Sequence, residues 1–194
     1  MGIVCIASVG LITACGNNDS KDSGKDNSNT VVSKNEETKA DSLFKKTFKV
    51  SLEDAIKTFE TQYTDAVITS IEFVKDFGSY KYSVEGVNDS KEFELKIDSD
   101  TKETKAQEET LDQDDANGQK KRNDVLELEK IITPQEAMEK ALVETKNKGE
   151  VVEWSIDQEA QRTYFEIKIK DGRNEIEVKV SANEGEILSV EKDD

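Results

Sequence analysis

The chain has 194 residues with a formal net charge of −16 and no histidine, and only 34% of its residues are apolar. The absence of histidine excludes Ser-His-Asp and Cys-His catalysis and removes the commonest zinc ligand. The acidic balance argues against nucleic acid as a partner, because that affinity depends on basic side chains that contact phosphates. The apolar fraction lies below the roughly 45–50% of average globular domains, which predicts one or two small domains.

The first 14 residues are typical of an export signal. Residues 3–14 carry no charge and are mostly apolar, but this run is shorter than the roughly 20 residues of a membrane span. Signal peptides usually have a basic start, and no Lys or Arg precedes the run, so we expect the natural start to lie upstream of Met1. Cys5 would be removed with the signal.

The end of the apolar run, Leu11-Ile12-Thr13-Ala14-Cys15-Gly16, resembles the lipobox of bacterial lipoproteins. The resemblance implies that cleavage separates Ala14 from Cys15 and that the Cys15 thiol carries the lipid. The protein would then be exported and attached to the outer face of the cell membrane through Cys15. The polar residues that follow cannot bury enough surface to offset their ordering entropy, so we predict a lipidated, disordered tether over residues 15–46.

An internal repeat occupies the rest of the chain. The aligned segments are 80–85 with 163–168 and 93–98 with 176–181 at an offset of 83 residues, and 51–55 with 133–137 at an offset of 82. Apolar positions fall on apolar positions in each segment, which indicates two copies of one structural unit. We predict the copies at residues 47–107 and 130–194, joined by an acidic linker over 108–129.

A helix is predicted at the start of each copy. Thr133 followed three residues later by Glu136 forms a capping box, which is typical of a helix N-terminus. Ser51 and Asp54 form the same pattern in the first copy. We expect Gly149 to end the second helix.

Period-two alternation of apolar and polar residues follows each helix. In the second copy the alternating apolar residues are Val152, Trp154 and Ile156, then Phe165, Ile167 and Ile169, then Ile176, Val178 and Val180. Such alternation predicts antiparallel strands with one buried face, and Asp171-Gly172 favours a tight hairpin. We therefore predict an α+β fold of two tandem small domains, each with one helix packed on a three- to four-stranded antiparallel sheet.

The capped helix, the three alternating strands and the closing run Ser181-Ala182-Asn183-Glu184-Gly185-Glu186-Ile187-Leu188 together resemble the PepSY domain. The signature ending of that family is Asp-Ala-x-Thr-Gly-Glu followed by aliphatic residues. The first copy ends in Asp98–Glu103 and lacks the glycine. The resemblance implies a binding module with no catalytic residues and no cofactor, found in secreted peptidases and in the envelope of Gram-positive bacteria.

The aromatic residues are the candidate contact residues. Trp154 and Tyr82 are predicted to lie in the core, whereas Tyr80 and Tyr164 are predicted on the exposed sheet face as partner contacts. The run that begins at Asp112 fails as a calcium loop, because Asn117 and Asn123 stand where glycine and glutamate are required. We expect no metal site.

Sequence and resemblance together predict a non-enzymatic, lipid-anchored cell-envelope protein. Its PepSY pair would bind another envelope or secreted protein, such as a peptidase whose activity it modulates or inhibits. The alternative is a surface lipoprotein that binds a small ligand or a cation through its acidic surface. The net charge also predicts that anionic lipid headgroups repel the repeats.

Overall fold

The structure is a computed structural model that describes residues 42–112 and 118–193. The expected signal segment, Ala14, Cys15 and most of the expected tether lie outside the described residues. The longest helices within the described ranges have 11 residues, which is too short to cross a bilayer.

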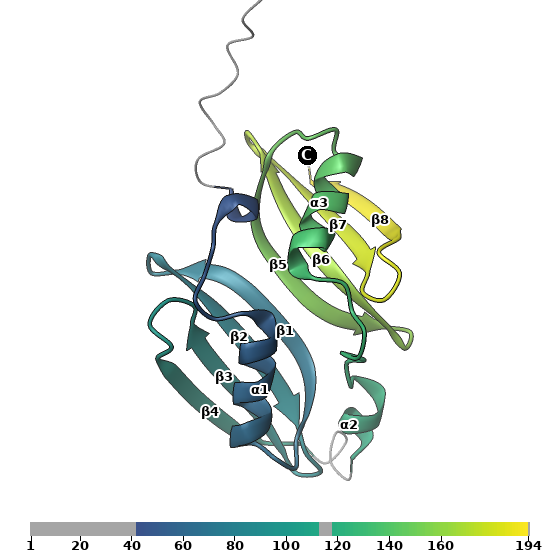
Figure 1. Ribbon diagram of the computed structural model, residues 1–194. Coiled ribbons are helices and arrows are strands. Elements are labelled where there is room, and N and C mark those ends of the chain that lie inside the picture. Colours follow the sequence, from purple (N-terminus) through teal and green to yellow (C-terminus); the bar gives the residue numbers. More distant parts are fainter. Residues whose placement is uncertain (1–41, 113–117, 194) are drawn as a thin grey trace, which may run out of the picture. The chain divides into compact units, whose positions relative to one another are not determined.

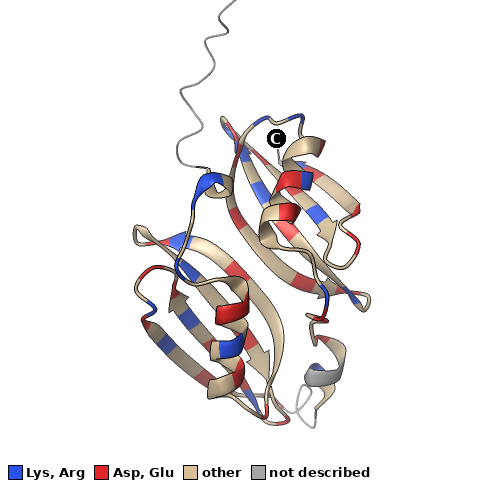
Figure 2. Cartoon of the chain, in the orientation of Figure 1, with Lys and Arg blue, Asp and Glu red and all other residues tan. Residues whose placement is uncertain are grey.

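Both long helices begin at the predicted capping boxes. In α1 (Leu52–Gln62), Ser51 Oγ accepts a hydrogen bond from Asp54 N at 3.1 Å, and the Asp54 carboxylate accepts one from Ser51 N at 3.1 Å. α3 (Pro134–Glu144) begins with the same reciprocal arrangement and has a proline in its first turn. Each box satisfies two backbone N–H groups that have no partner within the helix. Charged residues, red and blue in Figure 2, lie along both helices, and all of them are exposed.

The end of α3 differs from the prediction. The helix stops at Glu144, five residues before Gly149, and Lys146 and Asn147 take left-handed φ values of 58° and 57°. Asn147 N donates to the carbonyl oxygen of Leu142 at 2.7 Å, which satisfies a carbonyl at the end of the helix. The prediction for Gly149 was wrong because these two residues already turn the chain.

Eight strands form one antiparallel sheet in the order β4-β3-β2-β1-β5-β6-β7-β8 (Figure 1). The strands of the first repeat are β1 (Val67–Asp76), β2 (Ser79–Val87), β3 (Lys91–Asp98) and β4 (Thr104–Thr110), and those of the second are β5 (Glu150–Glu159), β6 (Arg162–Asp171), β7 (Asn174–Ser181) and β8 (Ile187–Asp193). The prediction of a separate small sheet in each domain was therefore wrong. The two four-stranded halves join because β1 pairs with β5.

The junction between β1 and β5 has a local two-fold symmetry. The paired residues are Ile71 with Ile156, Glu72 with Ser155, and Phe73 with Trp154. At the repeat offset of 83, Ile71 corresponds to Trp154 and Phe73 corresponds to Ile156. Each repeat therefore presents the same strand in the same register, as two subunits do in a symmetric dimer.

The two helices lie on the same face of the sheet (Figure 1). Directly opposed residues of neighbouring strands share a face, so the pairing of Phe73 with Trp154 makes the apolar faces of the two repeats continuous. α1 contacts β2, and α3 contacts β5, β6 and β7. Trp154 is 2% exposed and Tyr82 is 4% exposed, which confirms their predicted place in the core.

Residues of the expected linker contact both repeats. Residues 108–110 belong to β4, and α2 (Gln119–Asn123) follows. Leu126 N donates to the Ile68 carbonyl oxygen at 2.9 Å, and Glu127 N donates to Thr163 Oγ1 at 3.0 Å. The segment before α3 is thus bonded to β1 of one repeat and β6 of the other.

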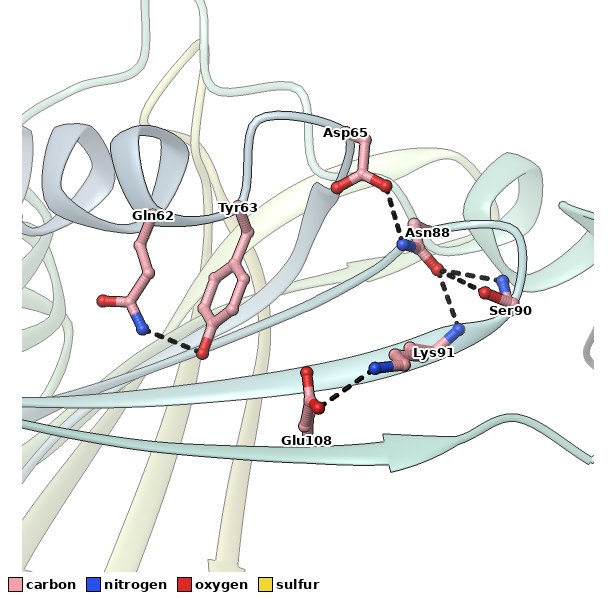
Figure 3. A network of polar contacts seen from close by, with 7 residues as sticks. All are labelled: Gln62, Tyr63, Asp65, Asn88, Ser90, Lys91 and Glu108. Carbon is pink, nitrogen blue, oxygen red and sulfur yellow. Dashed lines mark hydrogen bonds and ion pairs between the residues drawn. The ribbon is translucent and has the colours of Figure 1, made fainter.

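A polar network holds the β2–β3 turn in the first repeat (Figure 3). Asn88 Oδ1 accepts hydrogen bonds from the backbone N–H groups of Ser90 and Lys91 at 2.9 and 2.8 Å, and its Nδ2 donates to Asp65 at 2.9 Å. Lys91 Nζ lies 3.0 Å from Glu108 Oε1 on β4. These contacts connect the segment after α1, the turn and the edge strand, so we assign the network a structural role.

Candidate functional site

An apolar groove of about 1090 Å³ lies along the inner sides of α1 and α3. Its floor contains Phe73 of β1, Tyr82 of β2 and Trp154 of β5, so it takes side chains from both repeats. The groove exists because the β1–β5 junction places the two helices on one face of one sheet. A single repeat would supply only half of its lining.

The floor of the groove is a packed aromatic cluster. The ring centroid of Phe73 lies 4.4 Å from that of Tyr82, 5.4 Å from that of Trp154 and 4.9 Å from that of Phe48. The Tyr82 hydroxyl donates to the Val50 carbonyl oxygen at 3.2 Å. Burial raises the pKa of Tyr82 well above its usual value, so the hydroxyl stays a donor at physiological pH. The floor is therefore rigid and uncharged.

The walls are apolar and half-buried. They are formed by Leu52 and Ile56 of α1, Pro134 of α3, Phe48 of the segment before α1, and Leu128, Ile131 and Ile132 of the segment before α3. Half-buried apolar side chains around a groove can gain further burial from a ligand.

Charged residues also line the groove. Glu53 and Glu60 of α1 and Glu129 of the segment before α3 are exposed carboxylates, and Lys46 and Lys130 are the lysines. The lining has three carboxylates and two ammonium groups, so it carries a small excess of negative charge. The groove therefore favours an apolar ligand that also carries basic groups.

The opposite face of the sheet is polar. Lys168 Nζ lies 3.2 Å from Glu153, 3.8 Å from Glu175 and 3.9 Å from Glu177. Burial raises the pKa of Glu72 at the β1–β5 junction, and the nearby Glu153 raises it further. Within residues 42–112 and 118–193, no group of three His, Cys, Asp or Glu side chains is placed to hold a metal ion.

Tyr80 is buried, and the prediction that it is exposed was wrong. Its side chain is 9% exposed, and its ring centroid lies 5.1 Å from that of Phe48 and 5.6 Å from that of Phe73. The reason is the period of two in a strand, which places Tyr80 on the same buried face as Tyr82.

Tyr164 lies on the polar face of the sheet and is half-buried. Lys179 Nζ lies 4.8 Å from its ring centroid, close enough for a cation–π contact. Burial raises the pKa of Tyr164. Tyr164 is thus remote from the apolar groove, which lies on the other face, and its role as a partner contact stays a prediction.

Sequence reasoning missed two features. The apolar residues of the expected linker, such as Leu128 and Ile131, line the groove, and their apolar character within a polar stretch was an available signal. Phe77, at the tip of the β1–β2 hairpin, is fully exposed. The available signal there was Gly78, because a glycine between two alternating segments marks a turn and its neighbour is then exposed.

The chain matches a family model at two places. The PepSY model, described as peptidase propeptide and YPEB domain, matches residues 49–108 and 131–191. The chain belongs to the PepSY family. Both matches coincide with the two halves of the sheet, which confirms the two predicted PepSY repeats, and neither match indicates a catalytic domain.

A solved structure resembles this PepSY protein over most of its length. It is the crystal structure of a putative lipoprotein (CD1622) from Clostridium difficile 630, with 40% sequence identity and a TM-score of 0.75. The match covers 78% of this chain and 99% of that chain. No curated protein matches the chain.

Proposed function

We propose that this PepSY protein is a non-enzymatic, lipid-anchored protein of the cell envelope that binds another protein in the groove between α1 and α3. The lipobox-like run ending at Ala14 and Cys15 supports the anchor, as does the similarity to a protein described as a putative lipoprotein. The groove is the observation that carries the binding function, because it is large, apolar and built by both repeats.

The chemistry of the groove defines the partner. A segment with apolar side chains would gain burial against Ile56 and Ile131, and neighbouring Lys or Arg residues would face the carboxylates of Glu53 and Glu60. The family description names peptidase propeptides, which supports a secreted peptidase as the partner class. A peptidase bound in this way would be modulated or inhibited by the PepSY pair.

Site-specific photo-crosslinking in the source cells tests this proposal. A benzophenone amino acid at position 56 faces the groove, whereas the same residue at position 143 lies on an exposed part of α3 that does not line it. We expect one protein to be crosslinked from position 56 and not from position 143. Equal crosslinking from both positions would contradict binding in the groove.

Binding of the purified partner provides the quantitative test. Ile56→Glu places a carboxylate in the apolar groove and should weaken binding at least about tenfold, since a tenfold change corresponds to only about 1.4 kcal/mol. Val143→Glu changes a residue that is already 64% exposed and should leave binding unchanged. If the partner is a peptidase, its rate with a peptide substrate should fall on adding the wild-type chain and recover with Ile56→Glu.

Membrane attachment has its own test. Cys15→Ala should yield an uncleaved precursor without lipid. Intact-mass analysis of the wild-type protein from membranes should show cleavage before Cys15 and added acyl mass. A mature wild-type chain without lipid would contradict the anchor.

A further inference from the structure

Phe77 is a bulky apolar residue in a position that neither turn chemistry nor packing explains. It is fully exposed at the tip of the β1–β2 hairpin and has a φ of +46°, with Gly78 at +95°. Two consecutive positive φ values in a two-residue hairpin turn favour Asn-Gly, and a bulky side chain in this region is strained. Strained residues of this kind concentrate at functional sites.

The second repeat shows that this turn does not require an aromatic residue. The equivalent hairpin between β5 and β6 turns at Ala160 and Gln161, with φ values of 49° and 63°. Both turns therefore have two consecutive positive φ values, and the residue equivalent to Phe77 is an alanine. The phenyl ring of Phe77 has to be explained by something outside the fold.

Lysines surround the base of the Phe77 hairpin. Residues 44–49 and 74–81 together contain five lysines and one aspartate, and that aspartate, Asp76, is paired with Lys81 at 2.8 Å. Lys46 Nζ and Lys75 Nζ lie 5.7 and 6.0 Å from the centroid of the same ring, that of Tyr80. In Figure 2 the ribbon carries the blue of basic residues in η1 (Leu43–Lys45) and in this hairpin.

The equivalent segments of the second repeat have the opposite charge. Residues 126–131 and 157–164 contain four carboxylates and two basic residues. The net charge of the whole chain is −16, so a basic cluster beside an exposed phenylalanine is a local departure from its average. The exposed phenylalanine and this group of lysines both belong to the first repeat.

This region adjoins the point where the chain arrives from Cys15. Lys49 N donates to the Ser99 carbonyl oxygen at 3.1 Å, and Ser99 N donates to the Tyr80 carbonyl oxygen at 3.0 Å. The ring of Phe48 packs on that of Tyr80. Residues 46–49 therefore run beside the first residues of β2, at the base of the Phe77 hairpin.

We propose that Phe77 inserts into an anionic phospholipid surface while Lys45, Lys46, Lys49 and Lys75 bind its headgroups. Aromatic side chains bind at the boundary between headgroups and acyl chains, and clustered lysines add electrostatic attraction to anionic lipid. The proposal uses the lipid anchor of the proposed function, which holds this hairpin near the bilayer. The sequence predicts that anionic headgroups repel the repeats, because the net charge is negative. Around Phe77 the local charge is positive, so this region would be attracted instead.

Tryptophan quenching by brominated lipids tests the proposal. Residues 15–194 contain both repeats and a single thiol, Cys15, which can be coupled to a maleimide lipid in vesicles. Phe77→Trp places a fluorescent residue at the tip, and Ala160→Trp places one in the matched turn of the second repeat. The buried Trp154 contributes equally to both variants, and circular dichroism checks that both are folded.

On vesicles of brominated phosphatidylglycerol, the emission of Phe77→Trp should fall toward the contribution of Trp154 alone, and that of Ala160→Trp should be unchanged. The loss should disappear on brominated phosphatidylcholine, in high salt, and when Lys45, Lys49 and Lys75 are changed to Glu. Equal quenching of the two tryptophan variants overturns the proposal, and so does a fully exposed emission at position 77, as expected if Phe77 contacts a protein. The coupling is chemical, so this result does not depend on whether cells lipidate Cys15.

Discussion

Lys102 and Gly185 occupy the same position in the two repeats, and their backbones agree closely. Their φ values are 67° and 68°, both in the left-handed region. The first repeat has lost the signature glycine of the PepSY ending and has kept the turn that the glycine serves. A lysine at this position carries a conformational cost of about 1 kcal/mol, because its Cβ crowds the following carbonyl group.

Lys102→Gly should therefore stabilise the protein. We expect the free energy of unfolding to rise by about 0.5–1 kcal/mol, since the added freedom of glycine in the unfolded chain offsets part of the relieved strain. Urea denaturation measures the change. Lys102→Ala removes the same charge but keeps the Cβ, so it should give no gain, and an equal gain from both variants would assign the effect to charge.

In the core of each repeat, the size of a helix residue is matched to the size of the strand residue against which it packs. A Cβ added to Gly86 would lie 2.4 Å from Cζ of Phe59, so the small residue on β2 makes room for the ring on α1. The equivalent positions of the second repeat hold Ala141 and Ile169, which are both fully buried. In the first repeat the helix residue is large and the strand residue is small. In the second repeat the helix residue is small and the strand residue is large.

At the scale of elements, the residue that follows the third strand of each repeat is hydrogen-bonded to the segment that leads into the helix of that repeat. The Ser99 carbonyl oxygen accepts a hydrogen bond from Val50 N at 3.0 Å, and the Ala182 carbonyl oxygen accepts one from Ile132 N at 2.7 Å. Ser99 and Ala182 are both fully buried, which leaves room only for a small side chain. This contact gives a physical reason for the small residue in the PepSY ending.

Asp98, at the end of β3, organises the turn into β4. Hydrogen bonds from Thr101 N and Asp100 N at 2.9 and 3.1 Å, together with the Ser79 hydroxyl, lower the pKa of Asp98 to about 2. The pKa is lower in the folded than in the unfolded chain. The stabilisation is therefore fully present above the usual value of 3.8 and is lost as the pH falls from there toward 2.

Asp98→Asn should make the free energy of unfolding less dependent on pH in this range. The variant cannot ionise, so we expect a smaller loss of unfolding free energy than in the wild type as the pH falls from about 4 to about 2.5. Urea denaturation at several pH values measures the slope. Asp100→Asn removes a neighbouring carboxylate but leaves its N–H in place, and it should keep the wild-type slope. Parallel profiles for Asp98→Asn and the wild type would contradict the assignment.

At the scale of the whole molecule, the β1–β5 junction decides the architecture. Its two strands are equivalent elements of the two repeats and pair around Glu72 and Ser155. The outer edge of the first half, β4, consists of seven exposed residues and no large apolar ones. A polar edge such as β4 resists pairing with other chains, whereas the β1 edge pairs with β5.

The isolated second repeat, residues 124–194, should therefore form a symmetric dimer. Without β1, its β5 edge is free, and pairing about Ser155 would set Trp154 of each copy opposite Ile156 of the other. Sedimentation equilibrium should show a dimer that Ser155→Pro dissociates, because proline removes a backbone donor from the strand. The intact chain, in which β1 already covers this edge, is the control and should not pair through β5. A repeat that stays monomeric at all concentrations would contradict the prediction.

The sequence alone determined the parts of this protein that depend on near neighbours in the chain. The capping boxes at Ser51 and Thr133 act over three residues, and the alternation around Trp154 acts over two, so both could be read directly. The burial of Tyr80 follows from the same alternation, because Tyr80 lies two residues before the buried Tyr82 in one strand. The two PepSY repeats were visible because each carries its own complete set of these local signals.

Only the tertiary structure decided which strand edges meet. Every strand offers the same backbone N–H and C=O groups along its edge, so the alternation of side chains shows which face is buried and not which strand lies next to it. The pairing of β1 with β5 merged two predicted sheets into one and placed α1 and α3 on one face. The groove depends on that pairing, because Phe73 and Trp154 are 81 residues apart in the chain and adjacent only in the sheet.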